Sequence, residues 1–215
     1  MKKKELEKRS YNCEVRTIET EKEGVRTLTG RPIVYNSRTD LYWFDEIIEP
    51  GALDGADLTD VRFLVNHDIK GIPLARSRNN NMNSTLRLMP NEYGLDFESD
   101  VDVKNNARAS ELASAVDRGD ISGMSFMFSV DDEEWEDLQS DHPTRRIKKI
   151  GSVIEISAVT FPAYDDTEIH ARDKEALENA RSTLENVRKR DNTSLENEKE
   201  QLELEKLKIK ILSAL

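Results

Sequence analysis

Three polar side chains stand in or beside apolar segments of this chain, and their types are those needed for nucleophilic catalysis. His67 comes two residues after an apolar run, Ser125 stands within the apolar segment 123–130, and Glu155 stands within the apolar segment 153–161. Burying such a group without partners costs about 2–7 kcal/mol, so each is expected to have partners. A serine can supply the nucleophile, an imidazole the base and a carboxylate the group that orients the base. Together they predict attack of a serine hydroxyl on a carbonyl carbon.

Each of these residues also has an interpretation without chemistry. Ser125 can be a small strand residue whose hydroxyl bonds a neighbouring carbonyl. Ser122, three residues earlier at a turn, is either a competing nucleophile or a hydroxyl that closes the turn. His67 can be a capping group at the end of a strand, and Glu155 can lie on the polar face of a half-buried sheet. We favour Ser125 over Ser122 because a strand backbone can aim its hydroxyl.

Short strands separated by turn signals are expected to position these residues between about positions 12 and 171. The expected strands cover residues 13–18, 25–35, 44–53, 61–65, 85–89, 94–99, 123–130, 145–150 and 153–161. Along the last of these, strict alternation places Val153 and Ser157 on the same face as Glu155. If that face is buried, the carboxylate needs a cation or a donor, and an imidazole N–H would serve.

One helix and one acidic loop are expected among these strands. An apolar stripe over residues 105–118 predicts an amphipathic helix, and Gly119 is a natural stop at its C-terminal end. The acidic run 131–141 favours a solvated, mobile loop rather than a site.

The composition changes from about residue 173 onward, where Gly and Pro vanish and Glu, Lys and Leu dominate. Leu195, Leu202 and Ile209 are seven residues apart, which is typical of an exposed amphipathic helix or a short coiled coil. A break is expected near residues 191–194, where a Thr or Ser could cap a new helix. A partly frayed, solvated helix and an oligomerisation seam both remain open.

Charge and composition exclude several classes of function. The net charge is −11. Residues 172–215 carry ten basic and ten acidic side chains, so the acidity lies in residues 1–171 and disfavours binding to nucleic acid. No run of 18 apolar residues is present, and the basic start has no apolar stretch behind it, so neither a membrane span nor a secretory signal is expected.

The single cysteine and the scattered histidines suggest neither a disulfide nor a cofactor site. Cys13 alone cannot form an intrachain bridge and fits a reducing, intracellular location; it is also a weak alternative nucleophile. His67, His142 and His170 are too far apart for zinc-ligand spacing, and no Gly-rich phosphate loop occurs. We expect no metal and no cofactor.

Four strings occur here in the order typical of one family. They are FDEIIEPGAL at 44–53, NHD at 66–68, SGMSF at 122–126 and EISAVTFPAY at 155–164. On these strings the chain resembles the tailed-phage prohead proteases of the HK97 type, over roughly residues 11–171. Two departures replace glycines near the expected site: Met127-Phe128 stands where many relatives have Gly-Phe, and Leu74-Ala75-Arg76 stands where relatives often have Leu-Gly-Arg. Because glycine lets another backbone approach closely, its replacement affects how near the substrate backbone can come and the geometry of the oxyanion donors.

The resemblance implies a serine endopeptidase that works in the host cytoplasm, inside the immature phage capsid. Such an enzyme removes the scaffolding segment of the major capsid protein and cleaves itself. The implied fold is α+β, a bent antiparallel β-barrel flanked by helices as in the herpesvirus assembly proteases. The protease domain would cover residues 11–171, and residues 172–215 would form a charged helical tail that binds scaffold or is removed by self-cleavage.

By match to the family's motifs, the implied catalytic residues are His67, Ser125 and Glu155. The oxyanion donors are expected among backbone N–H groups, and Arg145-Arg146 is our prediction for them. The partners implied are the major capsid protein and its scaffolding segment, with self-association and without nucleic acid or membrane. The competing function is a non-catalytic scaffolding module of the capsid.

Overall fold

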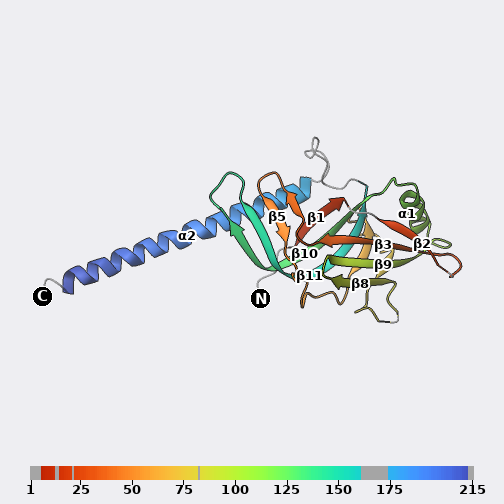
Figure 1. Cartoon of the computed structure of the whole chain (residues 1–215), viewed down its shortest axis with the longest axis horizontal. Helices are drawn as coiled ribbons and strands as arrows, with labels where there is room; N and C mark the ends of the chain where they lie inside the picture. The colour runs from red at the N-terminus through yellow and green to blue at the C-terminus, as the bar shows by residue number, and fades with distance from the viewer. Residues whose placement is uncertain (1–5, 13–14, 21, 82, 161–173, 213–215) are drawn as a thin grey trace.

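The computed structural model describes residues 6–12, 15–20, 22–81, 83–160 and 174–212, and these form an α+β fold with one long C-terminal helix (Figure 1). The strands are β1 Glu7–Asn12, β2 Arg16–Glu19, β3 Val25–Val34, β4 Arg38–Asp40, β5 Asp45–Ile48, β6 Arg62–Val65, β7 Ala75–Arg76, β8 Leu86–Asn91, β9 Gly94–Asp102, β10 Gly123–Glu136 and β11 Thr144–Val159. The helices are α1 Ala107–Asp117 and α2 Lys174–Leu212.

The larger sheet is built around the long strand β11. Its strand order is β1-β10-β11-β5-β4, and β6 also pairs with β11 and carries β7. β5 pairs in parallel with the first residues of β11, and β6 pairs in parallel with residues 155–158 near its other end. The two expected strands 145–150 and 153–161 are therefore one strand over the described residues, and Phe161 lies outside them.

The smaller sheet is antiparallel, in the order β2-β3-β9-β8. Within the described part of the chain, no strand pairing joins it to the larger sheet. The α+β class is confirmed, whereas the closed barrel stays a prediction. A tight backbone approach occurs at Gly94, whose φ is 144° and where a Cβ would lie 1.9 Å from the carbonyl oxygen of Ile33. Only glycine fits there.

One apolar core lies between the two sheets. Phe63, Phe126 and Ile156 enter it from the larger sheet, and Leu28 and Phe97 enter from the smaller one. The rings of Phe63 and Phe97 meet across the interface with centroids 5.5 Å apart. Each such side chain contributes about 1.5–3 kcal/mol through the apolar area that it buries.

Helix α1 confirms the helix expected at 105–118. The side chain of Asn106 caps it by accepting hydrogen bonds from the backbone N–H groups of Arg108 and Ala109. After Arg118 the chain turns through Gly119, whose φ is 76°. The apolar stripe includes Leu112 and faces the core.

Two sequence-based expectations about acidic and helical segments are wrong. The run 131–141 is a loop only from residue 137 onward, because β10 continues to Glu136 and pairs with β11 as far as Glu136↔Thr144. Glu133, Glu134 and Glu136 of this hairpin arm form ion pairs across to β11, which stabilises an acidic strand in the sheet. The break expected at 191–194 is also absent, since α2 runs unbroken through those residues.

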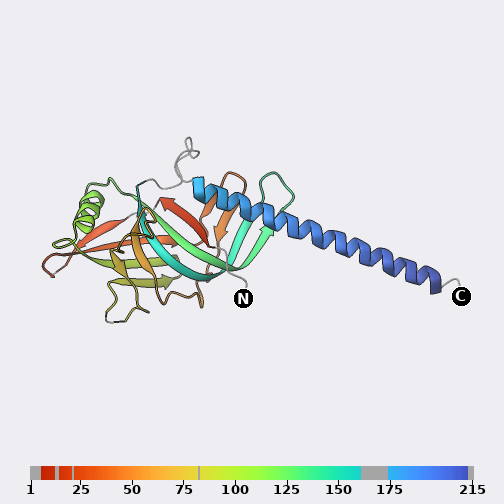
Figure 2. The same cartoon turned by 180° about the vertical axis from the view of Figure 1, so that it is seen from behind.

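Helix α2 has two parts with different environments. Ala180 and Leu184 are buried against Leu41 and Phe44, which ties the first part of the helix to the body. The distal part projects away from the sheets (Figure 2), and its large apolar residues are exposed. These are Leu195, Leu202, Leu204, Leu207 and Ile209. Among the described helices, none is long and apolar enough to cross a membrane.

Candidate functional site

His67 and Glu155 form the centre of the site. Nδ1 of His67 lies 2.6 Å from Oε1 of Glu155, and both side chains are largely buried. A neutral imidazole that donates its Nδ1–H to this carboxylate keeps the lone pair on Nε2, the nitrogen that can accept a proton. The pairing expected between these two residues is therefore present.

A left-handed turn brings His67 back over β11. β6 ends at Val65, and the next two residues, Asn66 and His67, have φ values of 51° and 56°. The side chain of Asn66 fixes the turn, because its Oδ1 accepts a hydrogen bond of 3.0 Å from the backbone N–H of Thr160. Since β6 pairs with residues 155–158, the reversal places the imidazole beside Glu155.

Ser157 contacts both Glu155 and His67, and sequence reasoning assigned it no role. Its hydroxyl donates to Oε2 of Glu155 at 2.5 Å and accepts the backbone N–H of His67 at 3.2 Å. Both carboxylate oxygens of Glu155 are thus engaged, one by the imidazole and one by the hydroxyl. The alternation of side chains along β11 could have predicted this contact, because it places Ser157 on the same face as Glu155.

The same pattern was wrong for Val153. The pairing of β10 with β11 steps from Met127↔Glu155 to Phe128↔Val153, so Ile154 is left out of register as a bulge. One extra residue reverses the alternation, and Val153 enters the main core while Glu155 faces the other way. Because of the bulge, Val153 and Ile156 both enter the main core, while Glu155 between them faces the opposite side of the sheet.

Ser125 lies on the neighbouring strand, on the same face of the sheet. It is the register partner of Ser157 in the antiparallel pairing of β10 with β11, and opposed residues share a face with Cβ atoms about 4.5–5.5 Å apart. Ser125 is fully buried, and its hydroxyl donates to the backbone carbonyl of Arg9 at 2.8 Å. Nε2 of His67 is also buried and has no hydrogen-bond partner among the described residues. The Ser125 hydroxyl thus lies on the same face of the sheet as Glu155, but it is bonded to the backbone of β1.

Ser122 is in a different setting. It is exposed at the turn before β10 and lines a surface hollow with Val15 and Val116, at the C-terminal end of α1. Of the two serines, only Ser125 is the register partner of a residue that contacts Glu155.

The loop after His67 is held by a charged contact that sequence reasoning missed. Oδ1 of Asp68 accepts the backbone N–H of Gly71, and Oδ2 lies 3.0 Å from Nη2 of Arg108 on α1. The hydrogen bond from Arg108 lowers the pKa of Asp68 below its ordinary value, although desolvation acts against it. Ile69 and Ile72 of this loop are exposed.

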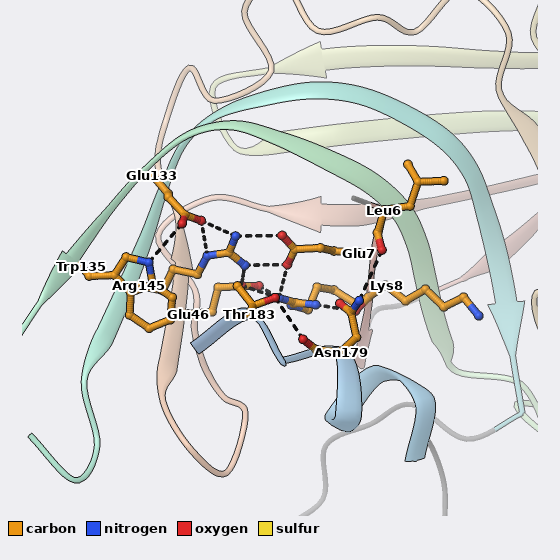
Figure 3. A network of polar contacts seen from close by, with 10 residues as sticks. Leu6, Glu7, Lys8, Glu46, Glu133, Trp135, Arg145, Asn179 and Thr183 are labelled. Atoms are coloured by element: carbon orange, nitrogen blue, oxygen red, sulfur yellow. Dashed lines mark hydrogen bonds and ion pairs between the residues drawn. The ribbon is translucent and has the colours of Figure 1, made fainter. Parts of the chain in front are cut away.

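The prediction that Arg145-Arg146 supplies the oxyanion donors is not supported by their position. Both residues lie in the part of β11 that pairs with β5, ten and nine residues before Glu155 in the same strand. Arg145 instead belongs to a buried group of five charged side chains, here named the charge cluster. Its members are Glu7, Arg9, Glu46, Glu133 and Arg145 (Figure 3).

The charge cluster joins four strands by charge-assisted hydrogen bonds. Arg9 donates to Glu46 at 2.6 Å and to Glu7 at 2.7 Å, and Arg145 donates to Glu7 at 2.6 Å and to Glu46 at 2.9 Å. Burial alone would raise the pKa of Glu7, but the charges of Arg145 and Arg9 lower it to about 2. Burial likewise opposes the charge on Arg145, yet Glu7 and the other carboxylates raise its pKa well above the ordinary value.

Comparison with known protein families gives one match. The family model described as caudovirus prohead serine protease matches residues 11–182, which is most of the chain. No curated protein and no solved structure matches.

Proposed function

Because the chain belongs to the caudovirus prohead serine proteases, we propose that it cleaves the scaffolding segment of the phage major capsid protein, and its own chain, during prohead maturation. The family supports a capsid-maturation protease that works inside the procapsid in the host cell. The substrate, the self-cleavage and the catalytic residues are our inference. Residues 11–171 would be the protease domain.

The observation that carries the proposal is the buried hydrogen bond between His67 and Glu155, with Ser125 on the adjacent strand and the same face. A carboxylate that holds Nδ1–H leaves Nε2 as the base. Among the described residues Nε2 has no hydrogen-bond partner, so its lone pair is available to accept a proton from a hydroxyl.

In the proposed mechanism, Oγ of Ser125 attacks the peptide carbonyl carbon while its proton passes to Nε2 of His67. The C–N bond then breaks, and the imidazolium gives that proton to the leaving amine. Water attacks the resulting ester with His67 again as base, and the acid product and free Ser125 are released. Glu155 stabilises the imidazolium without taking its proton.

The test is co-expression of the chain with its capsid protein, followed by mass spectrometry of the termini of both proteins. Ser125→Ala should lower processing by about 10⁴–10⁶-fold, while the matched variant Ser122→Ala should process normally. Processing of both proteins at the wild-type rate by Ser125→Ala would refute the assignment. If the wild-type chain neither shortens itself nor reacts with a serine-directed phosphonate, the competing function, a non-catalytic scaffolding module, is the correct one.

The tail 172–215 is proposed to load the protease into the assembling shell, where a high local concentration replaces intrinsic affinity. Since Ala180 and Leu184 pack on the body, the truncation that tests this should begin after Arg190. A chain truncated there that is packaged as efficiently as the full chain would refute the role of the distal helix.

A further inference from the structure

Strand β1 occupies the edge of β10 beside Ser125. It pairs antiparallel with β10 from Glu7↔Phe128 to Asn12↔Gly123, with Ser10 opposite Ser125, and β10 is its only partner among the strands that the structure describes. Its residues 7–10 precede the segment 11–182 that the family model matches. Among the described strands, β1 is therefore an edge strand. The family model matches only its last two residues, 11 and 12.

Two polar groups at the site are not engaged with each other, and β1 contacts one of them. The hydroxyl of Ser125 is bonded to the carbonyl of Arg9 on β1. Nε2 of His67 is buried without any partner among the described residues. A buried polar atom without a hydrogen bond costs about 1–3 kcal/mol, so this arrangement is disfavoured unless something enforces it. Removal of the Arg9 carbonyl would free the hydroxyl to turn toward the imidazole.

The charge cluster and α2 hold β1 in this place. Arg9 and Glu7 on β1 are bonded to Glu46 on β5 and Arg145 on β11. The side chain of Asn179 on α2 also reaches the carbonyl of Leu6, which Figure 3 shows beside the cluster. The side chains of Glu7 and Arg9 thus hold the strand in place, and the backbone carbonyl of Arg9 accepts the hydrogen bond of Ser125.

We propose that β1 is a resident inhibitory strand, and that it occupies the place of an extended peptide substrate on the edge of β10. Displacing β1 would expose the unpaired backbone N–H and C=O groups of residues 123–128, and an extended peptide can add to such an edge as a new antiparallel strand. The substrate class is therefore an unfolded or extended segment rather than a helix. The inference rests on the proposed function of Ser125.

The test locks β1 to β10 with a reversible disulfide. Lys8 and Met127 are register partners, so Lys8→Cys with Met127→Cys can form a cross-strand bridge in a Cys13→Ser background. A fluorophosphonate probe then measures the reactivity of Ser125 by intact mass, before and after reduction. A matched control bridge, Arg16→Cys with Thr29→Cys, joins β2 to β3 in the other sheet.

The reduced lock variant should label at least tenfold faster than the oxidised one, and the control bridge should label equally in both states. Equal labelling of the oxidised and reduced lock variant, with the bridge confirmed by mass, overturns the inference. A second variant starts at Tyr11 and so lacks most of β1; when folded, as judged by circular dichroism, it should label at least tenfold faster than the full chain. No gain from this truncation also overturns the inference.

These outcomes separate the inference from the proposed function. Labelling that is lost on Ser125→Ala but is insensitive to the lock leaves the protease assignment standing and removes the inhibitory strand. No labelling of any folded variant, including the truncated one, overturns the protease assignment itself.

Discussion

Glu7→Gln should destabilise the protein by about 3 kcal/mol at neutral pH, with a characteristic loss of that effect in acid. The pKa of Glu7 is lowered from 4.5 to about 2 in the fold, because the charges of Arg145 and Arg9 outweigh the burial that would raise it. Each unit of pKa is worth 1.36 kcal/mol, so ionised Glu7 stabilises the fold by about 3 kcal/mol. Glutamine keeps the shape of the side chain but carries no charge.

The pH dependence follows from the direction of the shift. Because the folded pKa of Glu7 is lower than the unfolded one, this stabilisation is fully present above about pH 4.5 and is lost as the pH falls toward 2. The difference between wild type and Glu7→Gln should fall by about half at pH 3 and vanish below about pH 2. Other carboxylates titrate in both proteins, so the difference isolates Glu7.

Urea unfolding at pH 7 and pH 3, followed by tryptophan fluorescence, measures this difference. The ring centroid of Trp135 lies 5.8 Å from Cζ of Arg145, so its fluorescence reports on unfolding around the charge cluster. Glu205→Gln on the exposed part of α2 is the control and should change the free energy of unfolding by less than about 0.5 kcal/mol at both pH values. A Glu7→Gln difference below about 1 kcal/mol at pH 7, or one that does not change with pH, would refute the reasoning.

Three further outcomes are expected. Ser157→Ala should lower kcat about tenfold with little change in KM, because the carboxylate that orients His67 loses its second donor; an unchanged kcat in a peptide assay would contradict this role. Phe97→Ala should cost about 3–5 kcal/mol in urea unfolding, since the ring is buried between the sheets, and a cost below 1 kcal/mol would contradict the shared core. Gly94→Ala should lower the melting temperature by more than 5 °C because its Cβ would collide with the Ile33 carbonyl, and an unchanged melting temperature would contradict the close approach.

The parts of the site that sequence could predict are those set by local pattern. Glu155 is a carboxylate in an apolar strand, and such a group, if buried, needs a cation or a donor. An imidazole N–H was one candidate, and the structure shows Glu155 buried and paired with His67. The strand end before His67 was equally evident from the apolar run. Both inferences were possible because a few neighbouring residues mark each of the two apolar strands.

The parts that sequence missed depend on contacts between distant segments. The bulge at Ile154 is set by the register against β10, and no local pattern marks it. β1 has the polar sequence EKRSYN, which carries no alternation of apolar residues. Its glutamate and arginine are buried only because Glu46 and Arg145 complete the charge cluster, and those partners are invisible in a local window.

The parallel pairing of β6 with β11 also has a consequence for when this region can fold during synthesis of the chain. His67 and Glu155 are 88 positions apart, and Ser125 and Arg9 are 116 apart, so the contact order of this region is high. Contacts between such remote segments close slowly, because the intervening loop must first lose its entropy. A nascent chain can form the hydrogen bond between His67 and Glu155 only once residue 155 has left the ribosome. If the proposed function holds, biosynthesis itself would delay the onset of proteolysis until most of the residues 11–171 have been made.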